Sequence, residues 1–130
     1  MNLESPKVTV KKNQKEIYNF LTQVENYKQL MPESMEKFEI TAPDSFLFAL
    51  KGMPQIELKI QETHEPDLVV LGSTSQKFNF TLNAVIEAAS DDSSDVQLHF
   101  DGKFNAMMAM MVKSPLKKFI TTLSENIAKV

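Results

Sequence analysis

Two residues of the chain could form an acid/base pair. Glu62 and His64 share the side of an alternating segment that also carries Leu58 and Ile60. An imidazole with its ordinary pKa of about 6.5 is the obvious base around neutral pH, so this pair at a cavity mouth is the best enzymatic candidate. Pro66 follows closely, however, and a bulge or twist at a strand end would turn both side chains to solvent. We favour that second interpretation and expect His64 at or near the surface.

The sequence gives little support for a metal site or a catalytic nucleophile. The chain has no Cys, which excludes disulfides, thiolate nucleophiles and cysteinyl metal sites. His64 and His99 lie on opposite parities and make a poor zinc site, and His99 should face water. Residues 91–95 (DDSSD) have the carboxylate density of a calcium loop but lack its central glycine and closing Glu, so we predict a hairpin turn. We expect neither a metal nor a cofactor.

Methionines gather at one place in the chain. Four of the eight lie within residues 107–111, at the start of a long apolar stripe. Flexible, polarisable Met side chains fill a core or line an adaptable cavity, and both interpretations stay open. Because these residues are nearly consecutive they must spread around a helix, and we expect Met108, Met111 and, at the margin, Met107 to point toward a sheet.

The remaining polar candidates are weaker. Tyr18 and Tyr27 could donate hydroxyl hydrogen bonds to a ligand, although Tyr18 only neighbours an apolar stripe and partial burial suits it better. The three isolated glycines build neither a dinucleotide fingerprint nor a phosphate loop, and no G-x-S-x-G turn is present.

Composition bounds the class of protein. A chain of 130 residues, 42% apolar and 24% charged, suits one compact domain over residues 1–130. All fourteen basic residues are Lys and the net charge is -3, which argues against nucleic-acid binding. No apolar run approaches the roughly 18 residues of a membrane span, so we expect no stable membrane insertion. The first residues show no signal-peptide pattern, and a cytoplasmic location is the default expectation. The oligomeric state is left open.

Hydrophobic periodicity predicts the elements that would position these residues. Alternation over residues 7–11 indicates a strand, and Asn13 with Glu16 resembles a capping box that starts an amphipathic helix. A second short helical turn ends at Pro32. Six alternating segments follow, separated by turn residues, and they carry Phe38 and Ile40; Phe46, Phe48 and Leu50; Ile56, Leu58 and Ile60; residues 69–71; Phe78, Phe80, Leu82, Ala84, Ile86 and Ala88; and Val96, Leu98, Phe100, Gly102 and Phe104.

A long helix closes the chain from about Ala106 to Lys129, either kinked at Pro115 or divided at Ser114. One helix cannot cover a flat sheet of this size, so the sheet must curl around it. We therefore predict an α+β fold with a curved seven-stranded antiparallel sheet that grips the long C-terminal helix, and with two short helices after the first strand. A bend beside the methionines would help to leave space under them.

This pattern resembles the START-like superfamily, also called SRPBCC, which has a helix-grip fold. The resemblance rests on the VTV strand at 8–10 that leads to Asn13, on the stretch from Phe20-Leu21 to YKQLMP at 27–32, and on the closing helix after Phe104-Asn105. It spans nearly the whole chain, and the length fits the short polyketide cyclase/dehydrase-like and ligand-carrier branches. It implies a hydrophobic small molecule held between the sheet and the C-terminal helix.

The leading hypothesis is a non-enzymatic binder of an apolar or amphipathic small molecule, lipid-like or polycyclic. The predicted ligand-lining residues lie on the inward parity of the strands and on the inner faces of the helices: Phe20, Phe48, Leu58, Ile60, Phe80, Leu82, Phe100, Met108, Met111 and Val112. A cyclase- or dehydratase-type enzyme that uses the same cavity is the alternative, with His64 and Glu62 as its weak catalytic candidates. A third hypothesis is a protein-interaction module with a fully packed core.

Overall fold

The computed structural model describes residues 1–76 and 78–130, which form an α+β fold. The strands are β1 (Asn2–Glu4), β2 (Val8–Val10), β3 (Met35–Ala42), β4 (Ser45–Leu50), β5 (Ile56–His64), β6 (Leu68–Ser73), β7 (Phe80–Ser90) and β8 (Ser93–Gly102). The helices are α1 (Gln14–Leu21), the 3-10 helix η1 (Val24–Leu30) and α2 (Ala106–Ile127).

All strand pairs are antiparallel, as predicted, and the strands follow the order β1-β8-β7-β6-β5-β4-β3, with β2 also paired to β8. The sheet has eight strands because the first edge is divided into β1 and β2. Pro6 lies at the break and has no N–H to give to the ladder. Ser5 spans the break: its N–H donates to the Leu98 carbonyl, and its Oγ accepts from the Leu98 N–H, both at 2.9 Å.

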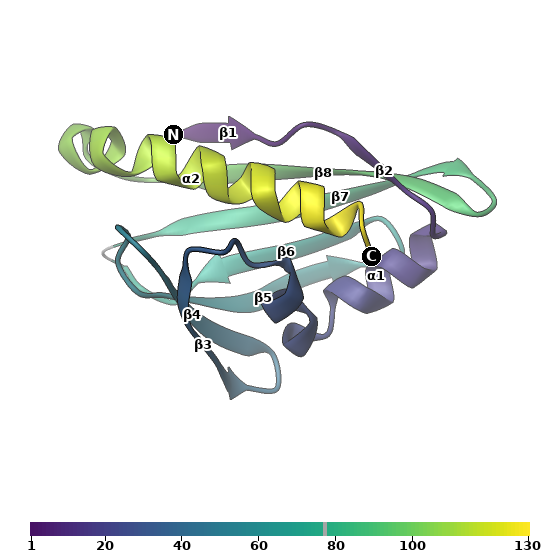
Figure 1. The fold of residues 1–130 in the computed structure, drawn as a ribbon, viewed down its shortest axis with the longest axis horizontal. Coiled ribbons are helices and arrows are strands. Elements are labelled where there is room, and N and C mark those ends of the chain that lie inside the picture. The colour runs from purple at the N-terminus through teal and green to yellow at the C-terminus, as the bar shows by residue number, and fades with distance from the viewer. Residues whose placement is uncertain (77) are drawn as a thin grey trace.

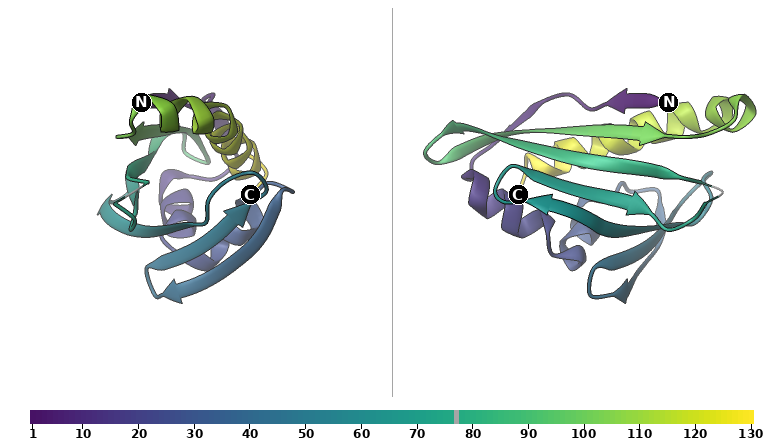
Figure 2. Two further views of the ribbon diagram at one scale, coloured as in Figure 1. Left: turned by 90° about the vertical axis from the view of Figure 1, so that its left-hand side faces the viewer. Right: turned by 180° about the vertical axis from the view of Figure 1, so that it is seen from behind.

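The sheet curls around α2, which lies across its concave side (Figures 1 and 2). Register shifts interrupt the β3–β4, β5–β6 and β7–β8 ladders. Such bulges bend a strand and increase its twist, which is what a sheet needs to close around a helix.

The two short helices cover one end of this curl. The capping box at Asn13 is confirmed, because Asn13 Oδ1 accepts from the Glu16 N–H while Glu16 Oε1 accepts from the Asn13 N–H. Gln14 Nε2 donates to the Ile86 carbonyl on β7 at 2.8 Å, and Asn126 Nδ2 of α2 donates to the Leu30 carbonyl of η1 at 2.8 Å. These bonds fix both short helices against the sheet and the end of α2.

The predicted alternation of buried and exposed side chains is clearest on the two long strands. Phe80, Leu82, Ala84 and Ile86 of β7 are buried, and so are the alternating residues Val96 to Gly102 of β8. It fails on β3, where Phe38 is only partly buried and 45% of Ile40 is exposed, because β3 is the last strand of the sheet. Phe78 and Phe104, predicted inside strands, lie just outside β7 and β8.

The C-terminal helix is one continuous α-helix that contains Pro115. Asn105 caps it, since its Oδ1 accepts from the Met108 N–H at 2.8 Å. The apolar stripe is buried over Val112, Leu116, Phe119, Ile120, Leu123 and Ile127. None of the helices in the described ranges is long and apolar enough to cross a bilayer.

We predict that Leu123→Ala lowers the free energy of unfolding by about 2–5 kcal/mol, because Leu123 is 2% exposed in the core. Met111→Ala, at a position that is 69% exposed, should stay within about 0.5 kcal/mol of the parent chain. Urea denaturation of the two variants checks this. Equal losses would mean that Met111 is packed in the core.

Candidate functional site

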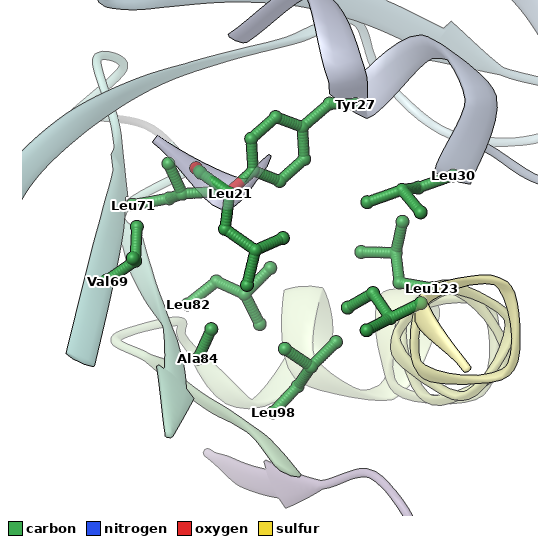
Figure 3. Close-up of a pocket in the computed structure, with 10 residues that line it drawn as sticks. Leu21, Tyr27, Leu30, Val69, Leu71, Leu82, Ala84, Leu98 and Leu123 are labelled. Carbon is green, nitrogen blue, oxygen red and sulfur yellow. The ribbon is translucent and has the colours of Figure 1, made fainter. Parts of the chain in front are cut away.

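A small enclosed void lies between the concave face of the sheet and the C-terminal half of α2. Side chains from β6, β7 and β8 and from α1, η1 and α2 converge on it (Figure 3). Its volume is about 10 Å³, roughly the room for one water molecule. The lining residues are Leu21, Tyr27, Leu30, Val69, Leu71, Leu82, Ala84, Leu98, Leu123 and Ile127.

Tyr27 is the one polar residue in this lining. Its hydroxyl donates to the Leu21 carbonyl at 2.7 Å, so the polar group is already satisfied within the protein. Burial raises the pKa of the Tyr27 hydroxyl well above its ordinary value of 10.0, because the phenolate would lose its solvation. The hydroxyl therefore stays protonated at neutral pH, and the void offers a ligand apolar contacts almost alone.

A row of stacked aromatic rings leads from the void toward the surface. The Tyr27 ring stacks on Phe46 at 4.9 Å between centroids, Phe46 on Phe48 at 5.9 Å, and Phe48 on Phe119 of α2 at 5.2 Å. These rings fill the interior between η1, β4 and α2.

The row ends at a surface pocket of about 200 Å³, which we call the mouth pocket. It lies between the segment after η1, the β4–β5 turn and the middle of α2, and its lining is Pro32, Ser34, Leu50, Lys51, Met53, Pro115, Lys118 and Phe119. The Lys51 N–H donates to the Ser34 carbonyl at 3.0 Å and ties the two loops together. Gly52 makes the turn possible with its φ of 83°.

Among the residues that the structure describes, two lysines and no carboxylate line the mouth pocket. Lys51 comes from the β4–β5 turn, and Lys118 comes from α2 one turn after Pro115. The pocket therefore combines apolar walls with positive charge at its rim, which suits a molecule with an apolar body and an acidic group.

The opposite end of the interior is filled, contrary to the expected space under the methionines. Four phenylalanine rings pack where α2 begins: Phe80 stacks on Phe100 at 4.7 Å, and Phe78 on Phe104 at 4.9 Å. Gly102 makes room for them, since a Cβ there would come within 2.6 Å of the Phe104 ring. The void consequently lies under Leu123 and Ile127, near the other end of the helix.

The predicted ligand-lining residues fall into three groups. Leu82 lines the void itself, while the other fully buried members belong to the surrounding core: Phe48, Leu58, Phe80, Phe100 and Val112. Phe20, Ile60 and Met108 are partly buried and pack against that core. The inward orientation predicted for Met111 is wrong, because the residue is 69% exposed, and Met107 is 74% exposed. Ligand contact by the ten residues stays a prediction.

Sequence reasoning left most of the void lining out of this set. Ala84 and Leu98 share the parity of Leu82, so the alternation on β7 and β8 already contained the signal that would have identified them. Tyr27, considered above only as a hydroxyl donor, and Leu30 come from η1, whose position over the sheet no local periodicity encodes.

The Glu62–His64 pair forms, but outside the cavity. Glu62 Oε1 and His64 Nε2 are 3.4 Å apart, and 62% and 63% of their side chains are exposed. The β5–β6 register shifts between Ile60 and Glu62, which confirms that a bulge places both at the surface. His99 lies on the outer side with 37% of its side chain exposed and Glu4 at 3.5 Å.

The remaining polar candidates lie at the surface. Residues 91–95 form the β7–β8 hairpin turn and the start of β8, as predicted, and Ser90 Oγ donates to Asp92 there. Within the described ranges no group of three or more His, Cys, Asp or Glu side chains could hold a metal ion.

The fold has close counterparts among solved structures. Norcoclaurine synthase from Thalictrum flavum, in complex with a transition-state analogue, superposes with a TM-score of 0.76 over 99% of this chain and 92% of its own, at 12% identity. A START superfamily protein from Mycobacterium smegmatis gives a TM-score of 0.70 over 98% and 97%, at 14% identity. A conserved protein from Geobacillus kaustophilus gives 0.70 over 99% and 93%, at 13% identity. The chain therefore has the START-like, helix-grip fold.

No protein-family model matches the sequence, and no curated protein does. At these identities the likeness concerns the fold, while activity has to be inferred from the site itself.

Tyr27→Phe tests the buried hydroxyl. Because burial raises the Tyr27 pKa, the folded state holds this proton more tightly than the unfolded chain. Its contribution to stability is full below about pH 10 and is lost as the pH rises further and the unfolded chain ionises. We expect the variant to lack this part of the alkaline loss and to be about 1 kcal/mol less stable at neutral pH.

Urea denaturation at a series of pH values measures both effects. Tyr18→Phe is the matched control, because Tyr27 is intact in it. An unchanged alkaline loss in Tyr27→Phe would show that the Tyr27 hydroxyl is not held in an apolar environment.

Proposed function

We propose that the protein binds an apolar or amphipathic small molecule, lipid-like or polycyclic, between the sheet and α2. The observation that carries the proposal is the row of stacked rings between the mouth pocket and the void. It runs from Phe119 in the pocket lining through Phe48 and Phe46 to Tyr27 in the void lining. Nine of the ten void-lining residues are aliphatic, and the tenth, Tyr27, has its hydroxyl engaged. A ligand there would gain by removing its own apolar surface from water.

Binding requires the interior to open. Sites for drug-sized ligands hold roughly 300–1,000 Å³, far more than the void of about 10 Å³. The ligand must therefore displace side chains, and the candidates are the Phe48 and Phe119 rings, which separate the mouth pocket from the inner lining. The leucine side chains and Met53 can change conformation around a ligand. The sheet behind them is kept rigid by backbone hydrogen bonds between its strands.

The mouth pocket favours amphipathic ligands with an acidic group. Lys51 and Lys118 would face that group at the rim while the apolar body enters along the aromatic row. A long-chain carboxylate is the simplest molecule of this kind, and a neutral polycyclic compound is the natural comparison.

A cyclase- or dehydratase-type enzyme is the second candidate, supported by the fold likeness to norcoclaurine synthase. Such a reaction would draw mainly on the shape of the cavity, since His64 lies outside it and the Tyr27 hydroxyl donates to the Leu21 carbonyl. The expected cytoplasmic location stays a prediction.

The binding proposal is tested by filling the void. Ala84 is 6% exposed and lines it, so Ala84→Leu should weaken the binding of oleate and of 1-aminoanthracene by about tenfold or more. Ala88→Leu is the matched control, because Ala88 lies on the same strand at an exposed position. Fluorescence titration measures the affinities, and organic extraction with mass spectrometry shows whether an apolar compound co-purifies.

Two outcomes would contradict the proposal. The first is that neither probe binds saturably and no apolar compound co-purifies, which would favour a packed interaction module. The second is that Ala84→Leu and Ala88→Leu bind both probes as the parent does, which would place the probes elsewhere on the protein.

His64→Ala separates binding from catalysis. We expect the variant to bind oleate with unchanged affinity, because 63% of the His64 side chain is exposed, outside the void and mouth linings. Its turnover is measured on a panel of cyclisable or dehydratable ketones. A parent chain that turns over such a ketone, and a variant that loses turnover while it keeps binding, would replace the binding function with the enzymatic one.

A further inference from the structure

Three methionines of α2 are exposed on one side of the helix. Met107, Met110 and Met111 are 74%, 83% and 69% exposed, and their spacing of three and four residues places them on a common face. Among the described residues the only other large hydrophobic side chain of this kind is Ile40. Exposed apolar side chains scattered singly are ordinary, but three side by side mark a contact surface.

Lysines continue this face along the helix. Lys117 and Lys118 follow on the outward side, where they border a shallow surface with Ser114, Thr121, Thr122 and Glu125. Lys103 and Lys113 flank the methionines in sequence, and the stretch 102–124 contains four lysines and no Asp or Glu, in a chain of net charge -3. We call the surface of Met107, Met110, Met111, Lys117 and Lys118 the Met-Lys face.

The lysines of this stretch are free to meet an external charge. In the part of the chain that the structure describes, the ion pairs of lysine involve Lys7, Lys37 and Lys59, and none of the four. Glu125 borders the same surface, but among the described residues it forms no ion pair with Lys117 or Lys118, so the Met-Lys face keeps an excess of positive charge.

The methionine end also stands clear of the rest of the molecule. Figures 1 and 2 show the first turns of α2 projecting beyond the end of the sheet, past the N-terminal strand β1. The four phenylalanines fill the interior at this end, so the projecting side chains are not needed to complete the core. The three methionines can thus leave water for an apolar environment without any rearrangement of the fold.

We propose that the Met-Lys face docks the protein on the surface of a bilayer rich in anionic lipids. The methionines enter the boundary between headgroups and acyl chains, and Lys117 and Lys118 meet the lipid phosphates, as in an amphipathic helix that lies in the interface. A protein partner fits less well, because the face carries none of the Trp, Tyr or Arg anchors that dominate protein interfaces.

The docking face adjoins the mouth pocket. Lys118 borders both, and Pro115 and Phe119 of the mouth pocket lie on the same stretch of α2. A docked bilayer would therefore lie beside the opening through which an apolar ligand would pass. The docking proposal itself rests on the exposed methionines and the unpaired lysines, and it holds whether or not a ligand binds inside.

Vesicle co-sedimentation tests the proposal. The whole chain should bind vesicles of phosphatidylcholine mixed with phosphatidylglycerol at low salt, bind pure phosphatidylcholine weakly, and lose affinity as salt is added. The triple variant Met107→Ser, Met110→Ser, Met111→Ser and the double variant Lys117→Gln, Lys118→Gln should each weaken binding by about tenfold or more. Ile40→Ser, an exposed apolar residue on β3, is the matched control and should bind as the parent does.

All substituted side chains are solvent-exposed, so thermal unfolding should show that each variant is folded. The proposal is overturned if the parent chain binds neither kind of vesicle, or if it binds both kinds equally and the methionine and lysine variants behave like Ile40→Ser. It is also overturned if the parent elutes as an oligomer in size-exclusion chromatography and the methionine variant elutes as a monomer, since the face would then join two copies of the chain.

Discussion

The burial of the α2 stripe against the concave face of the sheet is the interaction on which the rest of the structure depends. A sheet with one solvent-exposed face and one apolar face must bury the apolar face. A single helix can do this only when the sheet curls around it. The bulges, the divided first edge and the bond from Asn126 to Leu30 all serve that closure. Any volume between the sheet and the helix that side chains leave unfilled is available to a ligand.

The distribution of large and small side chains decides where that space lies. Phenylalanines occupy the end where α2 begins, and a second aromatic row occupies the middle. Only leucines, Val69, Ala84, Ile127 and one tyrosine line the remaining part, next to the C-terminal half of the helix. The interior is thus divided into a rigid aromatic end, a row of rings that a ligand would have to move, and a small aliphatic void.

Much of the fold could be predicted because its signals are local. The parity of β7 and β8, the Asn13 capping box and the hairpin at 91–95 follow from the order of residue types over a few positions. The division of the first edge depends on Ser5 meeting Leu98, far away in sequence, and could not be inferred locally. The location of the void depends on which side chains from distant elements fill the interior, which periodicity does not encode. The outward side of Met111 could have been inferred locally, because helical spacing places it with Met107 and Met110, away from the stripe that begins at Val112.

The central claim, an apolar ligand between the sheet and α2, is tested most directly by methyl NMR of the chain titrated with oleate. Intermolecular NOEs from the oleate chain should reach the methyl groups of Leu21, Leu82, Leu98 and Leu123, which line the void and come from four different elements. NOEs confined to Met107, Met110 and Met111, with the leucine methyl groups unperturbed, would show that the interior stays closed and would contradict the account.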